Sequence, residues 1–289
     1  MNEIKIPYEL FMCPRCKTKL IFDIQKISCP LCKKEVFQNG RFLDFSQLTP
    51  KLNLQFENYF LELYDRAGQV MQDINDTWRI EKLFKIIPKT NPGFICLEIG
   101  GADGPLTPKL ESLYSNVISL DISKTFLYRI ISKTKKTLCI YGDAQFLPIA
   151  DHSIDIIICS EVLEHVLIPT QLLSEMRRTI KPDGICILSV PNEGNEGILK
   201  RRKKYPIIAF DSHINFYNIV SLKKILNETG FDVLDYQKIG RKPNLKTFFL
   251  FPIIYLTNGT IYSHIICSLK PLTNPNIYWE TLEKNIGSG

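Results

Sequence analysis

Four cysteines near the N-terminus stand as two C-P-x-C pairs that could bind a metal ion. Cys13 and Cys16 form the first pair, and Cys29 and Cys32 form the second. Two thiolate pairs at this spacing suit one tetrahedral zinc ion, and four thiolates leave no coordination position for water. A segment this short cannot bury enough surface to fold unaided, so the ion would take the place of a core. The pattern predicts a structural zinc ribbon; the alternative is free thiols or two disulfides.

A second set of chemical groups consists of acids at the ends of apolar runs in the middle of the chain: Glu98, Asp121, Asp143 and Glu161. An acid after the second run can accept hydrogen bonds from both hydroxyls of a ribose. An acid beside a free backbone N–H, as at Asp143 and Ala144, can bind the amino group and a ring nitrogen of adenine. The acids therefore predict an adenine nucleoside as ligand. The alternative is that Asp121 caps the following helix and Asp143 holds a turn.

The turn after the first of these runs carries few side chains. Residues 97–107 read L-E-I-G-G-A-D-G-P-L-T, with glycine at 100, 101 and 104. A dinucleotide would need G-x-G-x-x-G and a helix N-terminus for its pyrophosphate. The acid inside this turn repels phosphate and favours an ammonium group. S-adenosylmethionine, which has an amino-acid tail and a sulfonium but no phosphate, therefore fits better than a dinucleotide.

The elements that must position these groups alternate between strand and helix patterns. Apolar runs predict seven strands, at residues 94–99, 117–120, 137–141, 154–159, 185–190, 231–239 and 262–269. Helical spacing predicts helices within 52–87 and over 221–229, and helical stretches separate most of the strands. This pattern predicts an α/β fold: a seven-stranded, mostly parallel Rossmann-like sheet with helices on both faces, its last two strands antiparallel, preceded by the zinc ribbon. The acids then converge at the carboxyl ends of the strands, where ligands of such sheets bind.

Several motifs together carry a family resemblance: residues 97–104, 120–121, 142–144, 153–155, 161–166 (E-V-L-E-H-V), 181–184 (K-P-D-G), 190–192 (V-P-N) and 222–231. As a set they resemble a class I S-adenosylmethionine-dependent methyltransferase. The resemblance implies that the cofactor-binding residues are Glu98, Gly100, Gly101, Gly104, Asp121, Asp143, Ala144 and Glu161. Ala102 stands where a second glycine is common in the family. The N-terminal segment is similar to the ribbons of many methyltransferases and to the small zinc-ribbon activator of tRNA methyltransferases. We expect a ribbon domain at 1–48 and a methyltransferase domain at 49–289.

His213 is the candidate base for a hydroxyl acceptor. It lies in the long loop after the fifth predicted strand, a loop that normally closes the acceptor side, and Asp211 could orient it. The alternative is that His213 only packs this loop. His165, in E-V-L-E-H-V, could orient the cofactor or be a packed histidine.

Two further segments bear on the acceptor. Residues 200–204 are five consecutive cations, either a solvated face or a contact for an anionic acceptor or RNA backbone. The apolar run at 248–255 could cover the core, pair two subunits of a homodimer or line a pocket. We expect O- or N-methylation of a small-molecule, glycan or lipid-linked acceptor. The alternatives are an RNA base methyltransferase, acting on rRNA or tRNA, and a non-catalytic partner. Against RNA, we expect the ribbon to lack the interleaved exposed aromatics that stack bases, and no Asn-Pro-Pro-Tyr motif follows the fourth strand.

Bulk properties agree with an intracellular enzyme. The chain has 289 residues, 45% of them hydrophobic, and a net charge of +6. Its nine cysteines include five that stand singly in apolar runs, which suits a reducing compartment. We expect no leader before the ribbon, and the longest apolar run is about half the length of a membrane-spanning helix. We expect a cytoplasmic protein without a transmembrane segment.

Overall fold

The computed structural model describes residues 6–23, 26–50, 77–89, 91–192, 213–240 and 262–272. The seven predicted strands all form, with bounds within two residues of the predicted ones except that β9 begins five residues earlier than predicted. They are β5 (Ile95–Ile99), β6 (Asn116–Asp121), β7 (Leu138–Tyr141), β8 (Ile154–Ser160), β9 (Ile180–Pro191), β10 (Phe231–Gly240) and β11 (Tyr262–Pro271).

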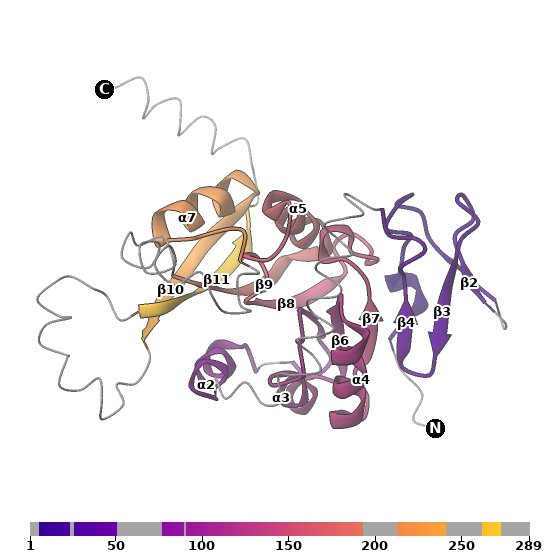
Figure 1. Cartoon of the computed structure of the whole chain (residues 1–289), viewed down its shortest axis with the longest axis horizontal. Helices are drawn as coiled ribbons and strands as arrows, with labels where there is room; N and C mark the ends of the chain where they lie inside the picture. Colours follow the sequence, from indigo (N-terminus) through magenta and orange to yellow (C-terminus); the bar gives the residue numbers. More distant parts are fainter. Residues whose placement is uncertain are drawn as a thin grey trace, which may run out of the picture.

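These strands make one sheet in the order β7-β6-β5-β8-β9-β11-β10. The strands from β7 to β9 pair in parallel, and β11 lies between β9 and β10, antiparallel to both. The predicted antiparallel pair at the end of the sheet is thus confirmed (Figure 1). Because β5 to β8 run in the same direction, their carboxyl ends meet at one edge, and the turn residues predicted to bind a ligand follow these ends.

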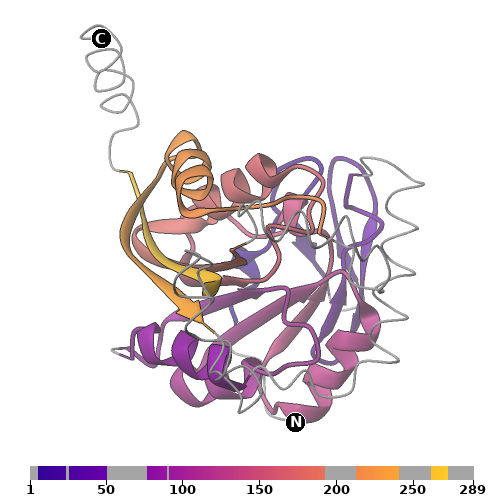
Figure 2. The same cartoon turned by 60° about the vertical axis from the view of Figure 1, so that its left-hand side comes forward.

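Helices cover both faces of the sheet (Figures 1 and 2). One face carries α2 (Thr77–Ile86), α3 (Thr107–Leu113) and α4 (Lys124–Lys133), and the other carries α5 (Pro169–Thr179) and α7 (Ile219–Glu228). Successive side chains of each strand point to opposite faces of the sheet. Leu97 belongs to the core cluster that includes α5 and α7, and Cys96 belongs to the one that includes α2 and α3. The helix predicted within 52–87 is confirmed at 77–86, and residues 52–76 lie outside the described ones. No described helix has the length and apolar character that crossing a bilayer requires.

The N-terminal segment forms a small antiparallel meander. A 3-10 turn, η1 (Tyr8–Leu10), precedes β1 (Ile21–Phe22), β2 (Ile27–Ser28), β3 (Glu35–Asn39) and β4 (Phe42–Asp44). Gly40 joins β3 to β4 with a φ of +55°, in the left-handed region that favours glycine. Gly40 therefore suits the tight turn that joins these two strands.

The meander does not stand apart from the main sheet. Strand β4 pairs in parallel with β7, with Leu43 opposite Ile140, and extends the sheet to eleven strands (Figure 1). The guanidinium of Arg41 donates to the carbonyl oxygens of Ile131, Thr134 and Thr137 at 2.8–2.9 Å. The ribbon thus covers an edge strand that would otherwise expose unpaired backbone groups. The sequence carries no sign of this pairing, because β4 is three residues long and joins a strand far along the chain.

Candidate functional site

The turn after β5 is held in a conformation that few residues adopt. Gly100, Ala102 and Gly104 have φ values of +71°, +47° and +79°. A Cβ on Gly100 would lie 2.3 Å from Cγ2 of Val162, and a Cβ on Gly101 would lie 2.3 Å from Oγ of Ser119. Close packing therefore explains both glycines. The alanine at 102 tolerates the left-handed conformation, so the departure from the family's glycine pattern does not open the turn.

Replacement of Gly100 by alanine is expected to lower the free energy of unfolding by about 2–4 kcal/mol, since a left-handed non-glycine residue and an overpacked Val162 each add a cost. Urea unfolding followed by circular dichroism measures the change. Gly142→Ala is the matched control, because a Cβ there meets its nearest neighbours at 3.9–4.0 Å, ordinary contact distances. Equal stability of the two variants would contradict the packing described for this turn.

Glu98 lies buried beneath the turn. Its Oε2 accepts hydrogen bonds from Oγ1 of Thr107 at 2.6 Å and from Oγ of Ser119 at 2.9 Å. Burial raises the pKa of Glu98 to about 7; the two hydroxyls act in the opposite direction, and the charge of Asp121 adds to the rise. A cation bound next to Glu98 would favour its charged form. The position therefore suits a ligand that carries an ammonium or sulfonium group.

Asp121, at the end of β6, ties the turn to the next helix. Its Oδ2 accepts from the backbone N–H of Ala102 at 3.0 Å, and its Oδ1 accepts from that of Ser123, the N-cap of α4, at 2.8 Å. Ser123, and not Asp121, is the N-cap of α4, because its Oγ accepts from the backbone N–H of Phe126, so the capping role considered for Asp121 is wrong. A carboxylate offers about four lone-pair sites, so two backbone donors leave capacity for ligand hydroxyls.

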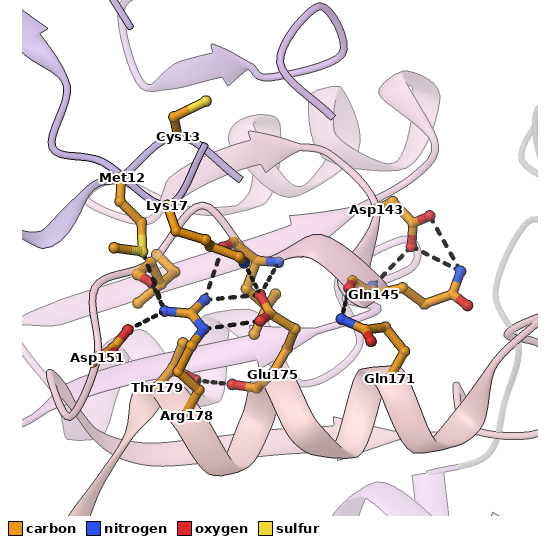
Figure 3. Close-up of polar contacts among 12 residues, drawn as sticks. Met12, Cys13, Lys17, Asp143, Gln145, Asp151, Gln171, Glu175, Arg178 and Thr179 are labelled. Atoms are coloured by element: carbon orange, nitrogen blue, oxygen red, sulfur yellow. Dashed lines mark hydrogen bonds and ion pairs between the residues drawn. The ribbon is translucent and has the colours of Figure 1, made fainter. Parts of the chain in front are cut away.

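Asp143 caps a short 3-10 turn, η2 (Ala144–Phe146), after β7. Its Oδ1 accepts from the backbone N–H of Gln145 at 2.8 Å, and the side-chain amide of Gln145 donates to both carboxylate oxygens at 3.2 Å. Gln145 in turn accepts from the backbone N–H of Ile168 and from Nε2 of Gln171 on α5. Figure 3 shows this chain of contacts from Asp143 through Gln145 to Gln171. Hydrogen bonds from the start of α5 therefore hold the turn that is predicted to bind adenine.

Glu161 follows β8 and has a φ of +58°. Its Oε2 lies 3.2 Å from Nε2 of His264 on β11, and its Oε1 accepts from Oγ of Ser189 at 2.8 Å. Burial alone would raise the pKa of Glu161, but the hydrogen bond to His264 and the charge of Arg79 hold this pKa below its ordinary value. Glu161 is therefore a charged group fixed at the sheet edge. Sequence reasoning missed His264, because the antiparallel return of β11 brings it there.

His213 lies beside a buried carboxylate that the sequence did not assign to the site. Its Nε2 is 4.0 Å from Oε1 of Glu164, and Nε2 of His165 is 3.8 Å from the same oxygen. The two imidazole rings meet edge to face with centroids 4.6 Å apart. The structure thus brings His213 and His165 together. One available signal was the histidine count: three of only four histidines in the chain gather at this edge.

The four N-terminal cysteines form a compact sulfur cluster. Their Sγ atoms lie within 4.8 Å of one another, and Cys13 and Cys32 are 3.9 Å apart. Zinc–thiolate bonds of about 2.3 Å place the sulfurs of a tetrahedral site ~3.8 Å apart. The backbone N–H of Cys16 donates to Cys13, and that of Cys32 donates to Cys29, both at 3.4 Å. The spacing and the N–H donors fit a metal ion bound by four thiolates.

A network of polar contacts joins this cluster to the turn at Asp143. Lys17, directly after the first cysteine pair, contacts Oε2 of Glu175 on α5 at 2.9 Å, and Glu175 accepts from the backbone N–H of Leu147 at 2.8 Å. Arg178 donates to the same Glu175 carboxylate and to the carbonyl of Ile149. Figure 3 shows Lys17 and Arg178 meeting at Glu175. Because Leu147 follows η2, the ribbon and the Asp143 turn share one support on α5.

Three sequence predictions lie outside the described residues: the basic run at 200–204, the apolar run at 248–255 and the orienting role of Asp211.

Comparisons with known proteins show the family of the chain. A family model described as a methyltransferase domain matches residues 72–236. A Mycolicibacterium smegmatis protein named as a probable S-adenosylmethionine-dependent methyltransferase is 25% identical over 157 residues, which are 54% of this chain and 59% of that protein. A malonyl-[acyl-carrier protein] O-methyltransferase from a Marinomonas species is 27% identical over 162 residues, with 51% and 57% of the two chains covered. The chain thus spans little more than half the length of these curated relatives.

A likeness to solved structures extends over more of the chain. A structure of a complex that contains the Haloferax volcanii Trm112 methyltransferase activator matches with a TM-score of 0.58 and 17% identity, covering 75% of this chain and 98% of that one. At this identity the likeness concerns the fold alone.

Proposed function

Since the chain belongs to the class I S-adenosylmethionine-dependent methyltransferases, we propose that it is a methyl-transfer enzyme. The methyl group of S-adenosylmethionine would pass to an oxygen or nitrogen of a small-molecule, glycan or lipid-linked acceptor. The observation that carries this proposal is the set of carboxylates at the ends of successive parallel strands, Glu98, Asp121 and Glu161, with Asp143 just after β7. Acids suit a cationic nucleoside and oppose a pyrophosphate.

The residues present fit this cofactor. Asp121 would bind the ribose hydroxyls, and Asp143 with the backbone N–H of Ala144 would bind adenine. Glu98 and the turn formed by Gly100, Gly101 and Gly104 would hold the methionine end, next to Glu161. When bound, the cofactor supplies an electrophilic methyl group on a sulfonium. The protein's task is then to orient the acceptor and remove its proton.

We assign the proton removal to His213. Oε1 of the buried Glu164 is 4.0 Å from its Nε2, and the charge of a carboxylate at this distance would stabilise the protonated imidazole. The side chain of His213 is 18% exposed, so an acceptor can reach it. For a hydroxyl acceptor, the proton would pass from the hydroxyl oxygen to the imidazole as the methyl group arrives.

Zinc bound by Cys13, Cys16, Cys29 and Cys32 is proposed as a structural element of the ribbon, with the domain boundary near residue 48. Five other cysteines are buried singly among apolar residues, a usage typical of proteins in a reducing compartment, so the cytoplasm is the proposed location. The basic run at 200–204 is the proposed contact for an anionic acceptor, and the apolar run at 248–255 is the proposed surface of a homodimer.

The alternative function is that of an RNA base methyltransferase, and it differs from this proposal in the class of acceptor. The net charge of +6 and the ribbon favour that alternative. Binding of an rRNA or tRNA fragment that weakens about 100-fold or more between 50 and 200 mM salt would indicate many phosphate contacts. The small-acceptor proposal expects no such binding. The curated O-methyltransferase named above acts, by its name, on a malonyl acyl-carrier protein.

Calorimetry on the purified chain tests the cofactor directly. We expect S-adenosylmethionine and its demethylated product to bind with one site per chain, and NAD to release no heat. Binding of NAD in preference to both would refute the proposed function.

The affinity for S-adenosylmethionine is expected to rise with pH. The cofactor's positive charge favours charged Glu98, so binding below the free-enzyme pKa of about 7 requires release of a proton. The dissociation constant should fall by up to ~10-fold per unit from about pH 5.5 to pH 7 and level off above. Calorimetry across this range measures the change. In Glu98→Gln the dissociation constant should not depend on pH here; a wild-type slope retained in Glu98→Gln would exclude Glu98 as its source.

A further inference from the structure

Glu164, His165 and His213 offer three ligand atoms to one point in space. The three atoms lie within 4.8 Å of one another, with both imidazole Nε2 atoms 3.8–4.0 Å from Oε1 of Glu164. Their residue types are those of a two-histidine, one-carboxylate metal site. We propose that these three residues bind one divalent transition-metal ion, at a site separate from the four-cysteine cluster.

The backbone fixes this geometry although His213 is far from Glu164 in sequence. The N–H groups of Ile214 and Asn215 both donate to the carbonyl oxygen of Glu164, at 2.9 and 3.0 Å. The side-chain amide of Asn215 donates to the carbonyl oxygen of Val166 at 2.8 Å. Three hydrogen bonds therefore hold the segment that begins at His213 against the loop after β8. The two residues that follow His213 are thus fixed by hydrogen bonds, and a metal ligand needs a backbone that is held in place in this way.

Charge and access also suit a cation. The Glu164 side chain is 1% exposed, whereas the side chains of His165 and His213 are each 18% exposed. The carboxyl group thus lies at the bottom and the two imidazole rings lie at the entrance. Three protein ligands leave further coordination positions open to water or to an acceptor.

The ligand set selects the kind of ion. Two imidazoles disfavour Mg²⁺ and Ca²⁺, which prefer oxygen ligands only, and favour Fe²⁺, Co²⁺ or Zn²⁺, while the carboxylate and the open water positions also admit Mn²⁺. Bonds of about 2.0–2.2 Å place neighbouring ligand atoms ~3.0–3.5 Å apart, so a bound ion would draw the present atoms inward by about 0.5–1 Å. The cysteine cluster, with four sulfur ligands, prefers zinc. The two sites therefore differ in the metals they select.

The site has a consequence for the reaction that rests on the proposed function. An acceptor hydroxyl bound at an open position of the ion would lose its proton to solvent more readily, as water does on zinc. His213 would then act as a ligand in the metal-bound enzyme, in place of acting as a base. This favours acceptors that present an oxygen to the ion.

Electron paramagnetic resonance with Mn²⁺ tests the site. Manganese binds thiolates weakly and will not displace zinc from the cysteine cluster, so the full-length, zinc-loaded protein is titrated with MnCl₂ without cofactor. We expect one Mn²⁺ per chain. Glu164→Gln and His213→Ala should each weaken binding ~100-fold or more. His152→Asn is the matched control, because His152 lies before β8, at the opposite end of this strand, and contacts the carbonyl oxygen of Ile180.

Two results would overturn the proposal: wild-type protein that binds no Mn²⁺ and no Co²⁺ up to about 1 mM outside the cysteine cluster, or binding that Glu164→Gln and His213→Ala leave unchanged. Thermal melts accompany each variant; if Glu164→Gln does not fold, the half-buried His165→Ala and His213→Ala decide. Cofactor calorimetry is run separately. If the protein binds the cofactor but not Mn²⁺, only the metal site is refuted. If it binds Mn²⁺ but not the cofactor, only the proposed function is refuted.

Discussion

Replacement of Asp121 by alanine is expected to weaken S-adenosylmethionine binding ~100-fold. Two hydrogen bonds from ribose hydroxyls to a charged carboxylate contribute about 3 kcal/mol together, and the variant loses both. The turn loses support as well, because the N–H groups of Ala102 and Ser123 donate to this carboxylate. Calorimetry gives the dissociation constant, and urea unfolding gives the stability.

Asp155→Ala is the matched control for this experiment. Asp155 also accepts a backbone hydrogen bond, from the N–H of Ile95 at 2.9 Å, and forms an ion pair with Lys181 at 2.6 Å. It lies at the start of β8, at the opposite end of the sheet from the carboxyl edge. Its loss should cost stability without weakening cofactor binding. If the two variants weaken cofactor binding equally, Asp121 acts only by supporting the turn.

The Cys13→Ser variant is expected to lose zinc and to unfold the ribbon. A ribbon of this size depends on its metal for folding, since it buries too little apolar surface alone. The loss should extend to the cofactor site: β4 would leave β7, and Lys17 would leave Glu175, which supports the turn that Asp143 caps. We expect cofactor affinity to fall ~10-fold, within the usual range of coupling between sites. Zinc analysis, thermal unfolding and calorimetry measure the three effects.

Cys267→Ser is the matched control, because this cysteine is buried on β11, far from the cluster in sequence and outside it in space. It should destabilise the main sheet yet retain zinc. Lys17→Met separates the metal from its link to α5: zinc should remain while cofactor affinity falls by a smaller factor. Coupling is reciprocal, so the cofactor should in turn stabilise the ribbon against chelators. A metal-free variant with wild-type cofactor affinity would show that the contacts in Figure 3 do not couple the ribbon to the cofactor site.

Local pattern by itself determined the main sheet and much of the candidate site. Strand and helix periods depend on residues a few positions apart, so all seven strands from β5 to β11 could be predicted from the sequence. The acids could be assigned to one edge for the same reason: an acid that ends a parallel strand must lie at the carboxyl edge of the sheet. The cysteine cluster could also be predicted, because the two cysteines of each C-x-x-C pair lie within four residues of the chain.

Tertiary structure alone decided which distant groups meet. The pairing of β4 with β7, the contact of Glu161 with His264 and the approach of His213 to Glu164 each join segments that are far apart along the chain. Such contacts depend on strand order, register and the course of long loops, none of which leaves a periodic trace in sequence. For the same reason the sequence could name His213, but only the fold shows the buried carboxylate and second imidazole beside it.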